Sequence, residues 1–376
     1  MPTVSRRKFI ALGAGGIALL AGSGIAARLW PQPAATHALP LSRATQVPSL
    51  QPRDVGYGLS PAPTVTETVP PTRSAPSVSL PVPPRVTHND EFYVIQYDEV
   101  PAVSLSSWSL TVHGLVRQPL RLSYEDIKAL PSVTTEHTLE CIGNPAGGNL
   151  IGNAQWRGIS LRALLERADV AASATHVVIG GVDEYLTSVP LARALHEHAL
   201  LVYEMNGEPL PLRHGFPLRA LLPGVYGQKQ PKWITGIGLS DGEQLGPWEQ
   251  KGWSRSATLQ LNSAIEWPRD AQRLDPGDMP IVGVAHAGEA GVRAVEVSAD
   301  GGQTWHETTL TRGPSPYVWT LWGYRWAQPA PGKYTLLVRA TDNLGKRQDQ
   351  MPAGLLADVF PDGTAAMHRI GVEVRG

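Results

Sequence analysis

The spacing of hydrophobic residues predicts a mixed α and β region from residue 87 to residue 262. Residues 134–141 suit a strand that ends in a glycine-containing turn, and a second strand is predicted at 177–180. Ser160 suits the N-cap of a helix, because leucines follow it at helical spacing. A short helix is also predicted at 191–198. The apolar face of the first helix would comprise Leu161, Leu164, Leu165 and Ala168.

From residue 263 to the C-terminus the pattern changes to short strands separated by turns. Residues 294–298 alternate between apolar and polar side chains, and a turn at 300–302 leads to a return strand that Trp305 opens. Strands at this spacing are typical of an immunoglobulin-like sandwich. Further strands are predicted at 317–321 and 333–340.

Length and composition agree with two folded domains. The chain has 376 residues, of which 42% are hydrophobic, and this favours a globular protein. We therefore predict the α+β class, with a mixed α/β domain at 87–262 and an all-β immunoglobulin-like sandwich at 263–376. The formal net charge of −1 and the lack of a basic run with interleaved aromatics argue against nucleic-acid binding.

The first 86 residues show neither pattern. Residues 36–86 are rich in proline, serine and threonine and cannot bury a core, so we expect an extended linker there. In residues 1–35, Arg6 and Arg7 precede a weakly apolar Gly/Ala-rich run, as in twin-arginine export signals. We predict export to an extracytoplasmic, periplasmic compartment. An ordinary secretory signal and an uncleaved membrane anchor stay open as alternatives.

Cys141 is the single cysteine of the chain, so no internal disulfide can form. In an exported protein such a thiol is buried and inert, paired with another chain, or chemically active. Its position where a strand enters a glycine-containing turn would let a thiolate project from a fixed backbone. Soft sulfur ligands suit thiophilic metals. One protein sulfur rarely holds a metal alone, so the other ligands would come from elsewhere, as a dithiolene cofactor would provide.

A second group of candidate residues lies in two loops rich in proline and glycine, at 214–219 and 226–233. Arg219 and Lys232 could hold a phosphate or a polar ring edge by charge-assisted hydrogen bonds. The alternative is a surface loop with solvated cations.

Two other kinds of site are weaker candidates. His196 and His198 suggest zinc, but histidines two residues apart on a helix point in different directions. Cys141 could be a hydrolytic nucleophile with His137 as its base, since both would lie on one strand face. The tryptophans of the C-terminal half are most simply core residues.

Five segments, taken in order, resemble the sulfite oxidase family of molybdenum enzymes. They are residues 89–93, the cysteine segment TLECIGN at 138–144, residues 156–159, the long run at 202–233, and VEVSADGGQTW at 295–305. The resemblance covers nearly everything after residue 87. It implies a molybdopterin domain followed by a dimerisation domain, and hence a homodimer.

The resemblance also assigns roles to individual residues. Cys141 matches the cysteine that ligates molybdenum and takes part in catalysis. The implied contacts with molybdopterin are Tyr93, Val94, Ile95, Cys141, Asp183, His214, Arg219, Gln230, Pro231 and Lys232.

Several positions depart from the family pattern and change the predicted substrate. Ile95 and Tyr97 stand where sulfite oxidases carry an arginine and a histidine, and Pro145 replaces another arginine. Trp253 aligns with their active-site tyrosine, and their substrate arginine falls near Ala290. Each lost charge-assisted bond is worth roughly 1.5–3 kcal/mol, so a sulfite dianion would bind far more weakly. This predicts a neutral substrate, selected by the pocket around Trp253.

The sequence therefore predicts an exported molybdopterin-dependent oxidoreductase that performs two-electron oxo transfer on a small S- or N-oxide. The alternatives are a sulfite dehydrogenase and, in another class, a non-catalytic exported binding module. The chain has no Cys-x-x-Cys-His motif for covalent haem. Electrons are thus expected to pass through a separate redox partner, a cytochrome or a quinone-linked membrane protein.

Overall fold

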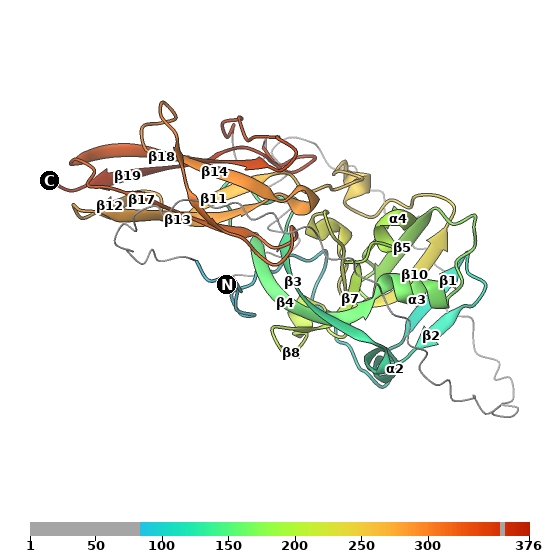
Figure 1. Ribbon diagram of the computed structural model, residues 1–376. Helices are drawn as coiled ribbons and strands as arrows, with labels where there is room; N and C mark the ends of the chain where they lie inside the picture. The colour runs from blue at the N-terminus through green and yellow to red at the C-terminus, as the bar shows by residue number, and fades with distance from the viewer. Residues whose placement is uncertain (1–82, 354–357) are drawn as a thin grey trace, which may run out of the picture. The chain divides into compact units, whose positions relative to one another are not determined.

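The computed structural model describes residues 83–353 and 358–376, which belong to one compact unit (Figure 1). The predicted signal at 1–35 lies outside the described residues, as does nearly all of the predicted linker at 36–86. Within the described ranges no helix is long and apolar enough to span a membrane. The limits of the two domains stay predictions.

The N-terminal region contains a five-stranded sheet in the order β2-β1-β10-β5-β6. The β1–β10 pair is parallel, and the other pairs are antiparallel. The strand predicted at 177–180 lies within β5, so this prediction is confirmed. The strands are β1 (Leu110–Gly114), β2 (Leu120–Leu122), β5 (His176–Gly181), β6 (Leu186–Pro190) and β10 (Ile234–Ser240).

A second five-stranded sheet runs in the order β3-β4-β7-β8, with β9 paired to β7. The strand predicted at 134–141 is confirmed as β3, which ends one residue before Cys141. The strands are β3 (Ser132–Glu140), β4 (Ile151–Ser160), β7 (Leu200–Met205), β8 (Glu208–Pro209) and β9 (Arg219–Leu221).

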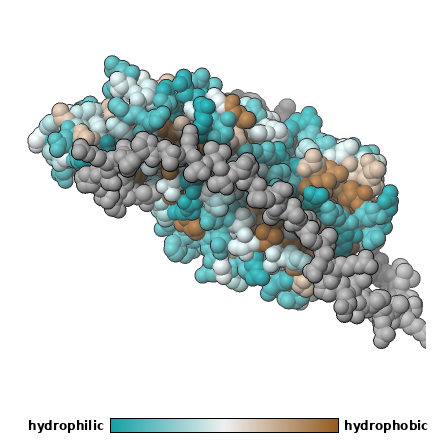
Figure 2. All heavy atoms as spheres, in the orientation of Figure 1, coloured by the Kyte–Doolittle hydropathy of each residue, from teal (hydrophilic) through white to brown (hydrophobic). Residues whose placement is uncertain are grey.

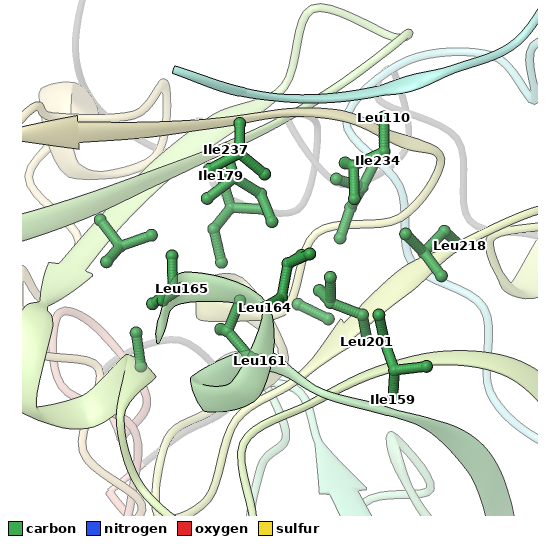
Figure 3. Packing of buried hydrophobic residues seen from close by; sticks show 14 of the residues in the cluster. Leu110, Ile159, Leu161, Leu164, Leu165, Ile179, Leu201, Leu218, Ile234 and Ile237 are labelled. Atoms are coloured by element: carbon green, nitrogen blue, oxygen red, sulfur yellow. The ribbon is translucent and has the colours of Figure 1, made fainter. Parts of the chain in front are cut away.

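Helix α3 (Leu161–Arg167) packs its predicted apolar face into the core of this region. Oγ of Ser160 accepts a hydrogen bond from the N–H of Ala163 (3.2 Å), which confirms the predicted N-cap. Leu161, Leu164 and Leu165 are all buried. Figure 3 shows these leucines among residues of both sheets, including Ile179 of β5, Ile237 of β10 and Leu201 of β7.

The helix predicted at 191–198 is only half as long in the structure. α4 comprises Leu191–Ala194, and its N-cap residue, Pro190, makes no side-chain capping bond. The N–H of Ala199 donates to the carbonyl of His196 (2.9 Å) in a turn that leads into β7. The prediction was wrong for the last four residues because the chain turns there. The other short helices are α2 (Tyr124–Ala129), η2 (Leu212–His214), η3 (Gly227–Lys229), η4 (Glu249–Lys251) and η5 (Gly288–Ala290).

The C-terminal region consists of two sheets, in the orders β11-β13-β17-β16 and β12-β19-β18-β14-β15. Side chains of both sheets share one core, in which Trp322, Val297 and Leu336 are buried. The predicted strands at 294–298 and 333–340 are confirmed, whereas the one predicted at 317–321 begins only at Thr320. The strands are β11 (Asn262–Trp267), β12 (Gln272–Leu274), β13 (Met279–His286), β14 (Val292–Ser298), β15 (His306–Glu307), β16 (Thr309–Thr311), β17 (Thr320–Trp326), β18 (Gly332–Asp342) and β19 (His368–Val374).

The structure therefore confirms the predicted fold class, a mixed α/β domain followed by a β-rich domain. Hydrogen bonds tie the end of β3 to the segment that leads into β17 of the C-terminal region. The N–H of Thr138 donates to the carbonyl of Tyr317, and Oγ1 of Thr138 accepts from the N–H of Trp319, both at 2.9 Å. Residues far apart in the sequence thus hold the strand that leads to Cys141.

Candidate active site

All predicted cofactor-binding residues, together with Trp253, line one cleft. Its volume, including space open to solvent, is about 840 Å³. The cleft brings together the N-terminal segment, the end of β3, the loop between β5 and β6, and the loops around β9 and η3. Residues that the sequence analysis did not assign to a site also line it, notably Gln96, Tyr185, Arg213, Gln228 and Trp248.

Cys141 follows the last residue of β3 and is held by the backbone of the next turn. Its N–H donates to the carbonyl of Leu150, and its own carbonyl accepts from the N–H of Asn144, both at 2.9 Å. Burial raises the pKa of the Cys141 thiol to about 11. A thiol activated for nucleophilic attack has a lowered pKa instead. The hydrolase alternative is therefore not supported.

His137 does not act as a base toward Cys141 in this structure. Its ring stacks on Tyr317 with the centroids 5.7 Å apart. Burial, together with the neighbouring His286 and His198, lowers the pKa of His137 to about 3. This imidazole therefore belongs to the packing between β3 and the C-terminal sheets.

Glu140, next to Cys141, braces the cysteine turn in a way that the sequence did not reveal. It is buried and accepts hydrogen bonds from the side-chain amides of Asn144 (3.0 Å) and Asn262. Oδ1 of Asn144 in turn accepts from the N–H of Leu150 (2.9 Å). Burial raises the pKa of the Glu140 carboxyl to about 7. The turn that presents the thiol is thus fixed from both sides.

One end of the cleft holds two cations, Arg219, which is buried, and Lys232, which is half-buried. A guanidinium N–H of Arg219 donates to the carbonyl of His214 (3.0 Å), and Nζ of Lys232 donates to the carbonyl of Arg213 (3.0 Å). Burial lowers the pKa of Arg219 to about 10 and that of Lys232 to about 7. The two side chains pack closely around Gly215, where an added Cβ would lie 3.0–3.1 Å from both.

These cations have no acidic partner within salt-bridge distance among the described residues. Nε of Arg219 is also buried without a hydrogen-bond partner there. Buried charges are normally paired, so this end of the cleft is suited to a bound anion such as a phosphate. The amide oxygens Oε1 of Gln96 and Gln228 are likewise buried and unpartnered. They are suited to the N–H donors of a pterin ring, so the cleft fits molybdopterin.

His214 contributes a neutral ring at the same end. Its Nε2 lies 2.8 Å from the carbonyl of Asn89. Burial lowers the pKa of His214 to about 4, so the ring is neutral and Nε2 carries its proton. Nδ1 is then left as a hydrogen-bond acceptor. The ring also packs edge-on against Phe92, with centroids 5.7 Å apart.

Gln230 and Pro231 order the loop rather than offering their side chains to the cleft. The side-chain amide of Gln230 donates to the carbonyl of Val225 (2.9 Å) and accepts from the N–H of Leu222 (3.0 Å). The carbonyl of Pro231 accepts from the N–H of Ala220 (2.9 Å). Both residues thus hold the backbone that carries Lys232.

Tyr93, Val94 and Ile95 cross the cleft as an N-terminal segment. Burial raises the pKa of the Tyr93 phenol well above its ordinary value, so the hydroxyl is neutral. It lies 3.1 Å from where a Cβ would stand at Gly227, which explains the glycine there. Burial also raises the pKa of Asp183, another residue that lines the cleft.

Aromatic side chains form the other end of the cleft. Trp253 packs against a small cluster formed by Ile142, Tyr226 and Ala257, of which Ile142 follows Cys141 directly. The ring of Tyr97 lies 5.8 Å from Trp248 and 6.0 Å from Tyr185, measured between centroids. The prediction that the C-terminal tryptophans are core residues was therefore wrong for Trp248, because a tryptophan in a loop has no periodicity that would reveal a cleft.

The positions that depart from the family pattern are divided between the cleft and other regions. Ile95, Tyr97 and Trp253 line the cleft, whereas Pro145 and Ala290 are not among its lining residues. The residue before Ala290, Glu289, forms an ion pair with Arg193 outside the cleft. The side chains of Ile95, Tyr97 and Trp253 are thus neutral lining residues. A cation at this end, Nζ of Lys251, lies over the rings of Trp248 (4.8 Å) and Tyr97 (5.3 Å) without lining the cleft itself.

The two histidines weighed as zinc ligands lie closer than predicted. The ring centroids of His196 and His198 are 5.7 Å apart, because α4 ends before these residues and they lie in a turn. The expectation that the rings point apart was wrong. Even so, no group of three or more histidine, cysteine, aspartate or glutamate side chains within the described residues is arranged to hold a metal ion.

Comparisons with known proteins agree with this site. Residues 97–248 match the oxidoreductase molybdopterin binding domain, and residues 254–374 match the Mo-co oxidoreductase dimerisation domain. The fold resembles the sulfane dehydrogenase SoxCD of Paracoccus pantotrophus, with a TM-score of 0.64 and 24% identity over 73% of this chain and 78% of that one. The protein is thus a molybdopterin-dependent oxidoreductase.

Three curated relatives narrow this class. Sulfite oxidase of Arabidopsis thaliana is 33% identical over 65% of this chain and 75% of its own length. Mitochondrial sulfite oxidase of Mus musculus is 31% identical over 77% of this chain but 62% of its own length. The uncharacterized oxidoreductase YuiH of Bacillus subtilis is 34% identical over 50% of this chain and 92% of its own length. The chain belongs to the sulfite oxidase family. The molybdopterin-binding domain confirms the predicted molybdenum–molybdopterin cofactor.

Proposed function

We propose that the protein catalyses two-electron oxo transfer with a small, neutral S- or N-oxide as its substrate. When bound, the molybdenum cofactor exchanges an oxo group with the substrate and takes up or releases two electrons. Cys141 is the proposed protein ligand to molybdenum and its thiol must lose its proton on binding. Arg219 and Lys232 would neutralise the phosphate of the cofactor, and His214 would hold the pterin as a neutral partner.

The division of the cleft into a cationic and an aromatic end carries the proposal of a neutral substrate. Arg219 and Lys232 lie beside His214 and its neighbour Arg213, where the anionic phosphate of the cofactor would neutralise their charge. Trp253 instead packs against the cluster of Ile142, Tyr226 and Ala257, and Ile142 follows Cys141 directly. A sulfite dianion at this end would find few charge-assisted bonds, whereas a neutral oxide would lose little on leaving water.

The aromatic residues have a second proposed role, the exclusion of water from the reacting atoms. Tyr97, Trp248 and Trp253 line the cleft and are large enough to cover a small substrate once it is bound. A dry site strengthens the hydrogen bonds that orient the substrate. Tyr93 stays protonated and could donate one of these bonds.

A sulfite dehydrogenase is the second candidate. Family membership favours it, since the relatives from Arabidopsis thaliana and Mus musculus are named sulfite oxidases. Arg213 also lines the cleft and adds a third cation. A non-catalytic binding module is less well supported, because the cysteine and the two cations suited to the cofactor are all present.

The first test is the molybdenum content of protein produced in a host that makes the cofactor. We expect about one molybdenum per chain, since the chain has one match to a molybdopterin binding domain and one candidate ligand, Cys141. Turnover is then measured in two assays. The first offers dimethyl sulfoxide or trimethylamine N-oxide as substrate with reduced viologen as the electron donor. The second offers sulfite with ferricyanide as the electron acceptor. Turnover of sulfite without turnover of either oxide would favour the sulfite dehydrogenase over the proposed oxide-dependent activity. Folded protein without molybdenum would refute both.

We also propose the cellular setting of this reaction. The twin arginines at Arg6 and Arg7 support export after the cofactor is inserted. The match of residues 254–374 to a dimerisation domain supports a homodimer. A cytochrome or a quinone-linked membrane protein would exchange electrons with the enzyme.

A further inference from the structure

Lys229 and Glu249 form an ion pair buried behind the wall of the cleft. Nζ of Lys229 lies 2.6 Å from Oε1 of Glu249, and their side chains are 2% and 0% exposed. In every other ion pair of the described residues, both side chains are at least 17% exposed. Neither residue of the buried pair lines the cleft. The proposed chemistry does not use it, so its role is open.

The pair is part of a hydrogen-bonded network anchored on β6. Nζ of Lys229 also donates to Oγ1 of Thr187 (3.0 Å) and to the carbonyl of Ser188 (3.1 Å). Oγ1 of Thr187 in turn donates to Oε1 of Glu249 (2.7 Å). All three protons of the ammonium group therefore have acceptors. A short strand, a 3-10 turn and a loop are held at fixed distances by one side chain.

Both members of the ion pair lie next in sequence to residues that line the cleft. Lys229 ends η3 and stands between Gln228 and Gln230, which line the cleft. Glu249 begins η4 and follows Trp248, which lines the aromatic end. Displacing either charged side chain would therefore shift a wall of the cleft without removing any group that faces it.

The loop before η4 is fastened to the same strand by its backbone. Oγ of Ser188 donates to the carbonyl of Gln244 (2.8 Å) and accepts from its N–H (3.0 Å). Gly246 lies so close to β6 that an added Cβ would stand 2.1 Å from the carbonyl of Leu186. The loop thus contacts β6 at both Gln244 and Gly246, and the buried ion pair anchors its C-terminal end at Glu249.

We propose that Lys229 and Glu249 are positioning residues that hold the aromatic wall, with Trp248 and Trp253, where it sets substrate affinity. Stability alone does not call for an ion pair here, because apolar residues of similar volume often replace a buried pair without loss. What they cannot reproduce is the set of directional bonds to β6. The role of the wall in binding substrate rests on the proposed function; the anchoring of the loop does not.

The test compares the wild-type holoenzyme with the double variant Lys229→Met/Glu249→Met, which removes both charges together. Arg162→Met/Glu166→Met is the matched control, since it breaks an exposed pair on α3 whose side chains are 56% and 60% exposed. Hydrogen exchange is measured on peptides covering 241–256. Amides of this segment are protected by bonds such as the one from Trp253 N–H to the Trp248 carbonyl (3.1 Å).

We expect exchange in 241–256 to become at least about tenfold faster in the double variant and to stay unchanged in peptides of the C-terminal sheets. Molybdenum content should equal that of the wild type. KM for the best substrate should rise about tenfold while kcat falls less than about threefold, the pattern of lost uniform binding. The control should match the wild type in all three measurements.

Three results would overturn the proposal: unchanged exchange at 241–256, faster exchange with an unchanged KM, or loss of molybdenum from the variant. If the double variant does not fold, Thr187→Val removes only the bridging hydroxyl and should change exchange and KM in the same directions. Wild-type protein that lacks molybdenum or turnover would instead refute the proposed function. The exchange comparison would then still decide whether the pair anchors the loop.

Discussion

Lys232 shows how strongly the cleft perturbs a single side chain. Burial, together with the neighbouring Arg219, lowers the pKa of its ammonium group to about 7. The nearby Asp183 opposes this effect but does not reverse it. A bound phosphate would restore the charge, so the cofactor and the protonation of this lysine stabilise one another.

Replacing Lys232 by methionine should change how the stability of cofactor-free protein depends on pH. The folded pKa of about 7 lies below the unfolded value. Between about pH 7 and pH 10.4, Lys232 is therefore protonated in the unfolded chain but neutral in the folded protein. The free energy of unfolding consequently rises with pH across that range. Lys232→Met should abolish this rise in urea unfolding curves. The exposed Lys333→Met should leave it intact, and an identical rise in both variants would contradict the assignment.

Cys141 is the residue on which the proposed chemistry depends most directly. Cys141→Ser keeps the shape of the side chain but replaces a soft sulfur by a hard oxygen. Turnover should fall by more than about 100-fold, above the effect usual for groups that only support a ligand. The free energy of unfolding should change by less than about 1.5 kcal/mol. A variant with wild-type turnover would exclude Cys141 as the metal ligand.

At the scale of elements, short segments join the walls of the cleft. η3 and η4 have three residues each and could not be stable alone. Contacts with β6 hold them in place through the network of Lys229 and Glu249. The sequence showed neither turn, because three residues are too few to display a hydrophobic period.

The single variant Lys229→Met should be less stable than the double variant that also removes Glu249. It leaves a carboxylate buried without its cation, which typically costs about 3–5 kcal/mol. Replacing both residues removes the unpaired charge, so the double variant should recover most of that loss. Chemical denaturation of the three proteins checks this order. Equal destabilisation by the single and double changes would show that the charges do not interact.

At the scale of the whole molecule, the family matches cover nearly the entire described chain. The face shown in Figure 2 is mostly hydrophilic, with apolar areas of limited extent. The dimerisation domain supports a homodimer, which light scattering coupled to size exclusion would detect as twice the chain mass of 40.4 kDa.

Export can be tested by changing two residues outside the described structure. Arg6→Lys with Arg7→Lys keeps both charges but removes the twin-arginine motif. We expect the protein to stay in the cytoplasm, still folded and loaded with molybdenum. Fractionation of cells that express each form provides the measurement. Equal export of both forms would favour an ordinary secretory signal.

The sequence by itself determined the local elements and the class of enzyme. The strand before Cys141 and the capped helix after Ser160 follow patterns of residues that are close together in the sequence, so the sequence alone predicts them. The family motifs likewise occupy continuous segments. These motifs predicted Cys141, the cations Arg219 and Lys232 and the cofactor, but not lining residues such as Gln96 and Trp248.

Only the tertiary structure decided how these segments meet. Glu140 and Asn262 are 122 positions apart, yet the side-chain amide of Asn262 donates to the carboxylate of Glu140 beside Cys141. Lys229 and Glu249 looked like ordinary charged residues until their burial was known. Such contacts depend on how sheets and loops pack, and packing is set by many distant residues together. For that reason no local sequence pattern predicts these contacts.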